Sequence, residues 1–331
     1  MSQFKGQITY REAINLALRE LMRNNPKVVV LGEDVGAAGG VFKVTDGLQA
    51  EFGAERVMDT PISETGFIGA SIGLALGGYK PIAELMFADF AGVAFDQIVN
   101  QAAKYLYLSA GQMPVPLVIR TVGGAGLGFA AQHSQTTESW YTAIPGLKVV
   151  VPATPQDAYE LLFAAVDDPN PVIYIEHKKL YTYQGELNTE VASKSKDIIG
   201  VAKIEKEGSD VTIVASLAMV WEALAAAQQL EQTGIGAEVI NIRSILPMDV
   251  NTVIQSIKKT GRLIVVEEQP LSGGWSGVLV AEVVERALDY LDAPPRRIGL
   301  PHAPVPFSKP LEERAVPCAQ TIARMAEEIM G

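Results

Sequence analysis

The stretch DTPISETGFIGASIGLALGGYKPIAEL, residues 59–85, decides the fold class, because it leads from a short strand through a helix into a buried strand. Glycines at positions 66, 69, 73 and 77 line what reads as a single helix, where small residues permit close packing against a neighbouring element. The apolar run from Pro81 to Leu85 is typical of a strand covered on both faces. An acidic residue, Glu64, stands at the start of the helix.

The same alternation extends over the N-terminal half of the chain. Thr9 to Glu12 form a capping box that predicts a helix reaching about Arg23. A second capped helix start, with Pro at its first position, lies at Thr154 to Asp157. Such alternation predicts a parallel sheet covered by helices. The further strands expected in this half are residues 28–31, 117–120, 147–151 and 172–175.

The pattern lapses in a polar stretch from about Tyr183 to Lys203 and then starts again. We therefore expect an α/β protein with two doubly wound domains: residues 1–185, a linker at 186–202, and residues 203–331. The second domain is predicted to contain strands at 211–215, 238–242 and 263–266, and helices at 220–232, 250–259, 278–291 and 318–329.

Composition excludes several classes of function. The 331 residues carry a net charge of −11, which argues against a nucleic-acid partner because such binding needs a basic face. Cys318 is the single cysteine, so an internal disulfide is excluded and a reducing compartment is expected. The most apolar run, from Phe67 to Gly78, is shorter than the ~20 residues that span a bilayer. We expect no membrane association and a cytoplasmic location, or an organelle matrix if a presequence has been removed.

Three motifs were weighed and set aside. The segment Gly69–Gly73 matches GxSxG, but a nucleophilic serine needs a strand-to-helix turn, and Ser71 falls within the expected helix. The glycine-rich residues 123–128 follow a strand without matching GxGxxG, which favours a flexible loop near a ligand. His133, His177 and His302 lack the spacing of a metal site.

Two residues carry both an ordinary and a functional interpretation. Glu64 at a helix start can simply offset the helix dipole, which is worth about 0.3–1 kcal/mol. Alternatively, apolar surroundings raise its pKa so that it shares a proton with a ligand nitrogen. His133 follows the glycine loop near an expected strand end, where α/β sites assemble, although a lone histidine is more often structural.

A resemblance decides between these interpretations. DTPISETG at 59–66, ELMFADF at 84–90, AQHSQ at 131–135, PGLKVVVP at 145–152 and INIRSILPMD at 240–249 stand in order along the chain. Together they resemble the beta subunits of thiamine-diphosphate-dependent 2-oxo acid dehydrogenases, typified by the pyruvate dehydrogenase component. The resemblance covers nearly the whole chain. It implies a transketolase-like pyrimidine-binding domain followed by a transketolase C-terminal domain.

The resemblance also implies roles for particular residues. Glu64 would hydrogen-bond the aminopyrimidine of thiamine diphosphate and so promote loss of the thiazolium proton. Ile62, Met86 and Phe90 would line the pyrimidine pocket, with Phe90 stacked on the ring, and Glu33 would lie near the cofactor. His133 would act as the acyl group passes to a lipoyl group. For Met86 and Phe90, an ordinary place in the core is the alternative.

Metal binding is divided between subunits in such enzymes. Magnesium and the diphosphate are usually held by a Gly-Asp-Gly stretch, which this sequence lacks; the nearest match is Thr45-Asp46-Gly47. That site is therefore expected on an alpha subunit, in an α2β2 tetramer. Relatives also bind a potassium ion in this subunit, at positions matching Leu117, Ala165, Val166, Asp168 and Asn170.

The predicted function is that of the beta subunit of a pyruvate-decarboxylating enzyme that transfers an acetyl group to the lipoyl-bearing core of a larger complex. It would be active only with its alpha partner. The beta subunits of acetoin and branched-chain 2-oxo acid enzymes share the same motifs and are the alternatives. A non-catalytic scaffold with the same fold is a further alternative, against which the presence of both Glu64 and His133 argues.

Overall fold

A computed structural model describes residues 4–192 and 197–331 and divides them into two compact units. Unit 1 holds the N-terminal part up to Gly123 and residues 140–199, and unit 2 holds residues 124–139 and 200–331. Residues 124–139, which fall within the first predicted domain, cluster by their contacts with unit 2. The predicted linker, 186–202, includes residues 193–196, which lie outside the described residues.

Unit 1 is built around a parallel sheet with the strand order β6-β7-β5-β4-β2-β3. In chain order its elements are β1 (Lys5–Thr9), α1 (Tyr10–Asn24), β2 (Val28–Gly32), α2 (Leu48–Phe52), β3 (Val57–Asp59), α3 (Glu64–Leu76), β4 (Lys80–Leu85), η1 (Ala88–Gly92), η2 (Gln97–Ala102), α4 (Tyr105–Leu108), β5 (Val118–Gly123), β6 (Lys148–Val150), α6 (Pro155–Asp167), β7 (Val172–His177), η3 (Lys178–Thr182), β8 (Gln184–Asn188) and α7 (Thr189–Ala192).

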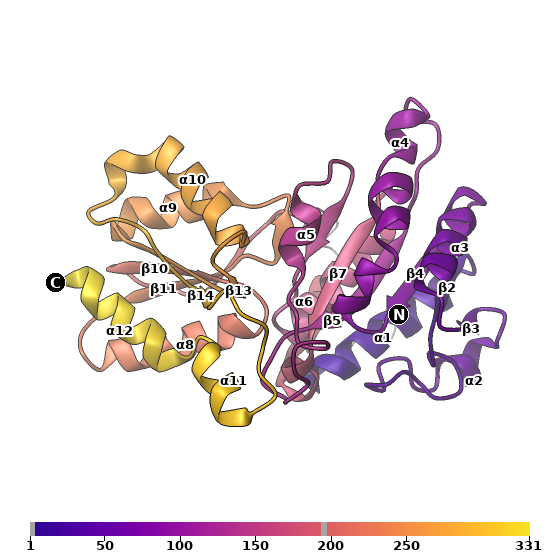
Figure 1. The fold of residues 1–331 in the computed structure, drawn as a ribbon, viewed down its shortest axis with the longest axis horizontal. Coiled ribbons are helices and arrows are strands. Elements are labelled where there is room, and N and C mark those ends of the chain that lie inside the picture. Colours follow the sequence, from indigo (N-terminus) through magenta and orange to yellow (C-terminus); the bar gives the residue numbers. More distant parts are fainter. Residues whose placement is uncertain (1–3, 193–196) are drawn as a thin grey trace. The chain divides into compact units, whose positions relative to one another are not determined.

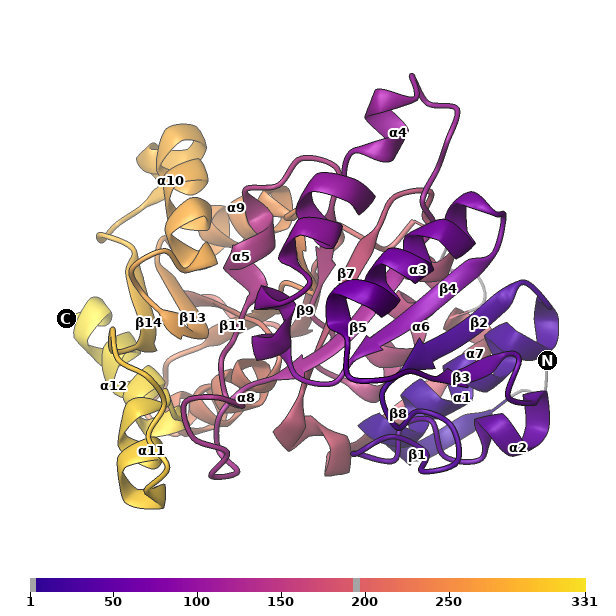
Figure 2. The same ribbon diagram turned by 45° about the vertical axis from the view of Figure 1, so that its right-hand side comes forward.

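Helices cover both faces of this sheet, as the alternating pattern predicted. Helices α1 and α6 pack against each other on one face, while α3 packs on β4 on the other (Figure 2). Every residue of β2, β5 and β7 is buried, because a parallel strand between two helical layers has no face toward water.

Both predicted capping boxes are present. The Thr9 hydroxyl accepts a hydrogen bond from the Glu12 amide at the start of α1, and the Glu12 carboxylate accepts one from the Thr9 amide. Thr154 and Asp157 make the same reciprocal pair at the start of α6, with Pro155 at the first helical position. These bonds satisfy amides that the helices cannot pair internally.

The polar stretch that begins near Tyr183 is more ordered than its composition suggested. Strand β8 pairs antiparallel with β1, from Lys5 opposite Asn188 to Thr9 opposite Gln184. Alternating polar residues hid both strands, because this small sheet is largely exposed and has no apolar run.

Unit 2 contains a second sheet with the order β14-β13-β10-β11-β9, parallel except for β9 at its edge. Helices α9 and α10 cover one face, and α8 and α12 cover the other (Figure 1). Its elements are β9 (Lys203–Lys206), β10 (Val211–Ala215), α8 (Ala218–Glu231), β11 (Ala237–Asn241), β12 (Ser244–Leu246), α9 (Val250–Thr260), β13 (Leu263–Pro270), α10 (Trp275–Ala287), η4 (Leu288–Tyr290), β14 (Arg296–Leu300), α11 (Lys309–Ala315) and α12 (Ala319–Met330); α5 (Glu138–Thr142) begins in unit 2 and ends in unit 1.

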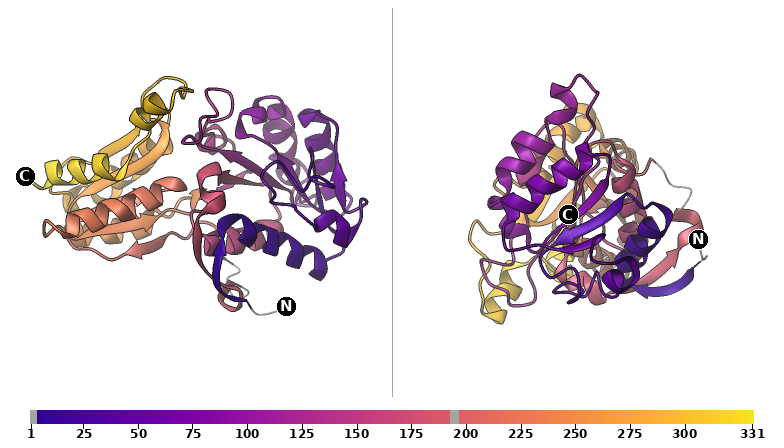
Figure 3. Two further views of the ribbon diagram at one scale, coloured as in Figure 1. Left: turned by 90° about the horizontal axis from the view of Figure 1, so that it is seen from below. Right: turned by 90° about the vertical axis from the view of Figure 1, so that its right-hand side faces the viewer.

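The predicted helices and strands of the second domain are found within a few residues of their expected ends. Three strands were missed: β9, a polar edge strand; β12, which has only three residues; and β14, which begins with two arginines. Among the described residues, no helix has the length and apolar character needed to cross a membrane. Figure 3 shows the chain from two further directions.

Candidate functional site

The residues singled out in unit 1 gather at one edge of its sheet. Strands β3, β2 and β4 are neighbours and run parallel, so their carboxyl ends lie side by side. Glu33 follows β2, Glu64 follows β3 by a short loop, and Met86 follows β4 directly. This edge, where three strands end together, is the usual place for a ligand in an open α/β sheet.

Two acids lie close to each other at this edge. Glu33 is 7% exposed and Glu64 is 8% exposed. Burial raises the pKa of the Glu33 carboxyl, and the negative charges of Glu64 and Asp34 raise it further. The Oε1 atom of Glu33 is buried and has no hydrogen-bond partner within residues 4–192 and 197–331. Buried carboxyl oxygens without a donor are costly, so this pair is suited to a ligand that supplies protons or donors.

Local contacts of helix α3 fix the position of Glu64. The Thr65 hydroxyl, next in the chain, donates to the Val93 carbonyl at 2.7 Å and ties the helix start to the end of η1. Phe67 and Ile68 are buried behind the acid, so its surroundings on the helix side are apolar. Ser71 donates to the Phe67 carbonyl at 2.8 Å in the middle of the helix. A hydroxyl used in this way confirms that the GxSxG match is not a nucleophile turn.

The apolar residues predicted to line the site differ in exposure. Phe90 is half-buried in η1, and its ring meets the edge of Phe87 with centroids 5.7 Å apart. Met86 is half-buried beside a small cavity of about 10 Å³ that Glu84 and Arg120 also border. Ile62 is 85% exposed in the loop before α3. The structure therefore offers three apolar groups around the same strand ends, with Ile62 open to solvent.

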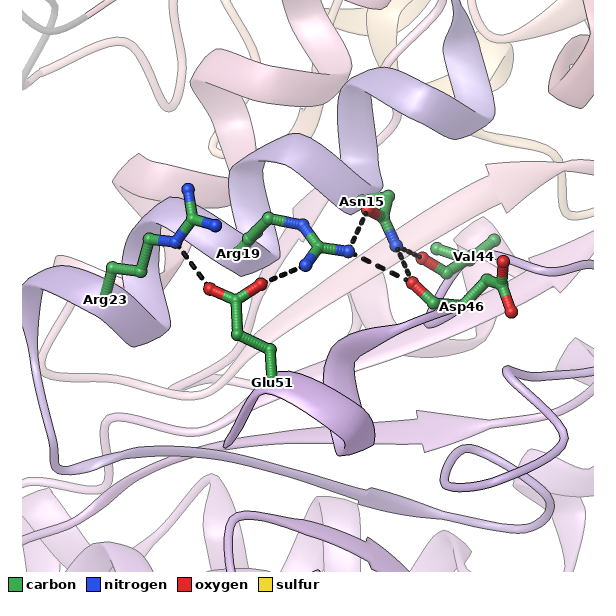
Figure 4. Close-up of polar contacts among 6 residues, drawn as sticks. All are labelled: Asn15, Arg19, Arg23, Val44, Asp46 and Glu51. Atoms are coloured by element: carbon green, nitrogen blue, oxygen red, sulfur yellow. Dashed lines mark hydrogen bonds and ion pairs between the residues drawn. The ribbon is translucent and has the colours of Figure 1, made fainter. Parts of the chain in front are cut away.

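The loop that carries Glu33 is fastened to helix α1 by the polar contacts in Figure 4. The Asn15 amide donates to the Val44 carbonyl at 2.7 Å, and Arg19 donates to the Asp46 carbonyl at 3.2 Å. Arg19 and Arg23 both pair with Glu51, which lies in α2; the Arg23 hydrogen bond is the main cause of its lowered pKa. These contacts hold the segment between β2 and α2 against the domain.

A close approach at Gly36 holds the other part of this loop. The Gly36 amide donates to the Asp59 carboxylate at 2.6 Å, which joins the loop after β2 to the end of β3. A Cβ atom at Gly36 would lie 2.4 Å from Asp59 Oδ2, far inside contact distance. Glycine is therefore required for the bond that brings the two loops of the candidate site together.

Sequence reasoning missed a buried ion network beneath the site. Arg120 on β5 pairs with Glu84 on β4 at 2.6 Å and with Glu176 on β7 at 2.7 Å. Burial raises the pKa of Glu176 to about 7, against the opposing effect of the Arg120 charge. Its signal in the sequence is the appearance of charged residues inside otherwise apolar strand runs. The network, in which two carboxyl groups share one guanidinium, links three neighbouring strands and rigidifies the part of the sheet that carries the site.

His133 belongs to unit 2, in the segment 124–139, and is half-buried. Carboxyl groups are concentrated in the same unit near the end of β13. Burial raises the pKa of Glu138 to about 8 and that of Glu267 to about 7. The dipeptide Glu267-Glu268 at the end of an apolar strand was the available signal for this cluster, and sequence reasoning did not use it.

The residues named for potassium adjoin one another in unit 1. The Leu117 carbonyl accepts from the Val172 amide at 2.9 Å, and the Ala165 carbonyl accepts from the Asp168 amide at 3.4 Å. Asp168 pairs with Lys148 and accepts from the Asn170 amide at 2.9 Å. Carbonyl oxygens keep a second lone pair for an ion, whereas the Asp168 carboxylate already has partners.

Histidine and acidic ligands give no metal site among the described residues, because no cluster of three such side chains occurs there. His177 is buried and accepts a hydrogen bond from the Lys179 amide at 3.2 Å, a structural role.

Two family models match consecutive parts of the chain. The transketolase pyrimidine-binding domain matches residues 6–184, and the transketolase C-terminal domain matches residues 200–322. A solved structure described as a split-gene transketolase, an inactive beta4 tetramer, superposes with a TM-score of 0.78 and 27% identity, covering 98% of this chain and 99% of that one. The fold is therefore that of two transketolase-type domains.

Among characterised proteins, the pyruvate dehydrogenase E1 component subunit beta-1 of Arabidopsis thaliana is 46% identical, over 97% of this chain and 89% of the relative. The corresponding subunit of Saccharomyces cerevisiae is 44% identical, over 98% and 89%. The beta subunit of the acetoin:2,6-dichlorophenolindophenol oxidoreductase of Bacillus subtilis is also 44% identical, over 98% and 97%.

Proposed function

This chain belongs to the beta-subunit family of thiamine-diphosphate-dependent 2-oxo acid dehydrogenases, and from that premise we propose that it forms half of the active site of a pyruvate-decarboxylating enzyme. The observation that carries the proposal is the acid pair at the strand ends. Glu64 is buried, beside Glu33, and accepts no hydrogen bond from any residue that the structure describes. An acid held in this way is prepared for a ligand rather than for the fold.

The residues present fit the pyrimidine end of the cofactor. Thiamine diphosphate, when bound, supplies the electron sink for loss of carbon dioxide from a 2-oxo acid. Glu64 would share a proton with a ring nitrogen of the aminopyrimidine, as a positioned carboxyl group does in acid–base catalysis. Glu33, with its unpartnered Oε1, would accept a hydrogen bond nearby. Phe90 would stack on the ring, and Met86 and Ile62 would cover its edges.

The diphosphate end would be held by another chain. This sequence contains no Gly-Asp-Gly stretch. A magnesium ion beside the diphosphate needs oxygen ligands, which would therefore come from another chain. We propose that an alpha subunit supplies them and that two copies of each subunit form an α2β2 tetramer. The enzyme would then be active only when both subunits are present.

We propose that His133 acts after decarboxylation, when the acyl group leaves for a lipoyl group on the acyltransferase core of the complex. An imidazole can give a proton to a leaving sulfur, as opening of the lipoyl disulfide requires: one sulfur becomes acylated and the other leaves as a thiol.

A potassium ion would bind at the end of α6, held by carbonyl oxygens of Leu117, Ala165 and Val166 with Asp168 and Asn170 beside them. The neighbouring carbonyls of this region support the proposal. Because Asp168 is already paired with Lys148, the ion would depend mainly on backbone oxygens. We place the enzyme in the cytoplasm, or in an organelle matrix as the mitochondrial relatives suggest.

A second candidate is the beta subunit of an acetoin-cleaving enzyme. It is favoured by the Bacillus subtilis relative, whose identity and coverage nearly equal those of the pyruvate dehydrogenase subunits. A branched-chain 2-oxo acid enzyme and a non-catalytic scaffold are the remaining alternatives. Acid chemistry at Glu64 is common to all the catalytic candidates, so the structure of this subunit does not separate their substrates.

Co-expression with candidate alpha subunits tests the proposal. The purified tetramer would be assayed with pyruvate, branched-chain 2-oxo acids and acetoin, using an artificial electron acceptor and added thiamine diphosphate and magnesium. Turnover of pyruvate well above the other substrates is expected. Preference for acetoin would select the second candidate, and absence of turnover with every alpha partner would favour the scaffold. Full activity of this chain alone would contradict the half-site.

A further inference from the structure

The glycine-rich loop of residues 124–128 binds the carboxylate of Glu312, a residue of the same chain. Glu312, in the first turn of α11, is 2% exposed, and its carboxylate faces this loop. The Gly126 amide donates to Glu312 Oε1 at 2.7 Å, and the Gly128 amide donates to Oε2 at 3.1 Å. Both glycines have positive φ, 96° and 70°, which lets two nearby amides point at the same group.

A second acid holds the beginning of the loop. The Ala125 amide donates to Glu268 Oε1 at 2.5 Å, from the end of β13. The far end is held by Gln269, whose amide nitrogen donates to the Thr136 carbonyl at 3.0 Å and whose oxygen accepts from Ser139 at 2.6 Å. The Gly124 amide also donates to the Gln135 carbonyl at 3.3 Å and closes the loop. All these contacts lie within unit 2.

His133 stands inside the span that these contacts close. Its backbone position depends on the loop before it. Residues 125–128 belong to no strand or helix; Ala125 packs in a small apolar cluster with Leu300 and Val305, and the Gly126 and Gly128 amides bond the Glu312 carboxylate. A buried carboxylate with charged hydrogen bonds is a strong anchor, roughly twice as strong as a neutral pair. Loss of that anchor would free the two glycine amides and loosen the segment that carries the imidazole.

We propose that Glu312 is a positioning residue: its carboxylate occupies the amide nest of Gly126 and Gly128 and so sets the place of His133 for acyl transfer. The proposal rests on the role proposed above for His133. It also accounts for a glycine-rich loop that follows a strand without being a nucleotide site, since the anion such a loop binds is supplied from α11.

Hydrogen exchange of the reconstituted α2β2 enzyme tests the anchor itself. We compare wild type with Glu312→Ala, Glu312→Gln and the control Glu313→Ala, whose exposed carboxylate only approaches Lys309 at 3.8 Å. Exchange of the peptide covering 124–135 should become about tenfold faster in Glu312→Ala, as expected for losing buried hydrogen bonds. Glu312→Gln keeps one oxygen acceptor and should show a smaller change. Unchanged exchange in both Glu312 variants overturns the proposal.

Activity then separates positioning from general damage. Glu312→Ala should slow acyl transfer to a lipoyl domain roughly ten- to a hundred-fold, because small displacements of a reacting group are costly. Turnover with an artificial acceptor, which bypasses that transfer, should change less than about twofold. In a His133→Ala background, Glu312→Ala should cause no further loss of transfer.

The outcomes distinguish this inference from the proposed function. Normal acyl transfer in His133→Ala alone would contradict the proposed role of His133. Hydrogen exchange would then still test whether Glu312 anchors the loop. Slow transfer in His133→Ala with normal transfer in Glu312→Ala would overturn the positioning role only. If Glu312→Ala fails to assemble with the alpha subunit, the Glu312→Gln enzyme carries both measurements, and normal exchange and transfer in it count against the proposal.

Discussion

Unit 1 and unit 2 both bury acids at the ends of parallel strands, yet they treat them differently. In unit 1, Glu33 has a buried oxygen with no partner in the described part of the chain. In unit 2, Glu267 accepts from the Ser276 hydroxyl and Glu312 accepts from two glycine amides. A partnered acid maintains the fold, and an acid left without donors keeps its hydrogen-bonding capacity for a ligand. The comparison predicts opposite effects of substitution in the two units.

The largest expected effect is on activity, at Glu64. Glu64→Gln keeps the shape of the side chain but removes the proton exchange proposed for it. In the reconstituted tetramer, turnover should fall about 10²- to 10⁴-fold, the usual contribution of acid–base catalysis. The unfolding midpoint should stay within about 1 °C, because no described residue donates to this carboxylate.

The matched control for Glu64 is Glu55→Gln at an exposed position in the same unit, which should change neither quantity. Pyruvate-dependent reduction of an artificial acceptor and thermal unfolding provide the two measurements. Turnover within about threefold of wild type in Glu64→Gln would exclude the acid role, because the smallest loss expected for that role is about 10²-fold.

In unit 2 the largest effect should be on stability, at Gln269. This side chain is 2% exposed and bonds the Thr136 carbonyl, Glu138 and Ser139. Gln269→Ala removes these three hydrogen bonds and should lower the free energy of unfolding by about 2–4 kcal/mol. Urea unfolding followed by circular dichroism measures it. Gln255→Ala, at an exposed position of α9, should stay within about 0.5 kcal/mol, and equal losses in both variants would contradict the reasoning.

The sequence could predict what depends on local pattern. Capping residues placed α1 and α6, and apolar runs placed the buried strands, because these signals come from groups adjacent in the chain. Strands β1 and β8 escaped because their partners lie some 180 residues apart and neither is apolar. The same reason hid Glu312: its partners, Gly126 and Gly128, are about as distant in sequence, and nothing near Glu312 marks it as buried.

Glu64 and Glu33 could be named from sequence only through the family resemblance, since an acid at a helix start is common. The structure adds that β2 and β3 are neighbours in a parallel sheet, which brings the two acids to one edge. Membership of residues 124–139 in unit 2 could not be predicted either. That segment is joined to β5 of unit 1 in the chain, and its contacts with Glu268, Gln269 and Glu312 become visible only in three dimensions.

The next effect is the pH dependence of stability in unit 2. Burial raises the pKa of Glu138 from 4.5 to about 8, so the folded chain holds this proton more tightly than the unfolded chain does. Its contribution is therefore fully present below pH 4.5 and is lost as the pH rises through about 8. Glu138→Gln mimics the protonated form and should be about 1–2 kcal/mol more stable than wild type at pH 8.5.

Urea unfolding at pH 5 and pH 8.5 checks this prediction for Glu138. At pH 5 the variant and wild type should agree within about 1 kcal/mol, since in the folded state both are then uncharged at this position. Glu267→Gln removes hydrogen bonds accepted from Ser276 as well as a charge, so it should show the same sign of pH dependence with a lower stability at both values. A variant of Glu138 less stable than wild type at pH 8.5 would show that the hydrogen bond from Gln269 stabilises the charged form by more than its burial costs.

The smallest effect returns to the acid pair of unit 1. Burial, and then the charges of Glu64 and Asp34, raise the pKa of Glu33. The stability contribution of its proton is present below 4.5 and is lost as the pH rises through the raised value. At pH 7.5 Glu33→Gln should therefore stabilise the chain by about 0.5–1 kcal/mol, and by less in a Glu64→Gln background, where one repelling charge is gone. Urea unfolding of the four chains in this cycle measures the coupling. Additive changes in the free energy of unfolding would mean that the Glu33 and Glu64 carboxyl groups do not influence each other. The proposed contrast with the hydrogen-bonded acids of unit 2 would then fail.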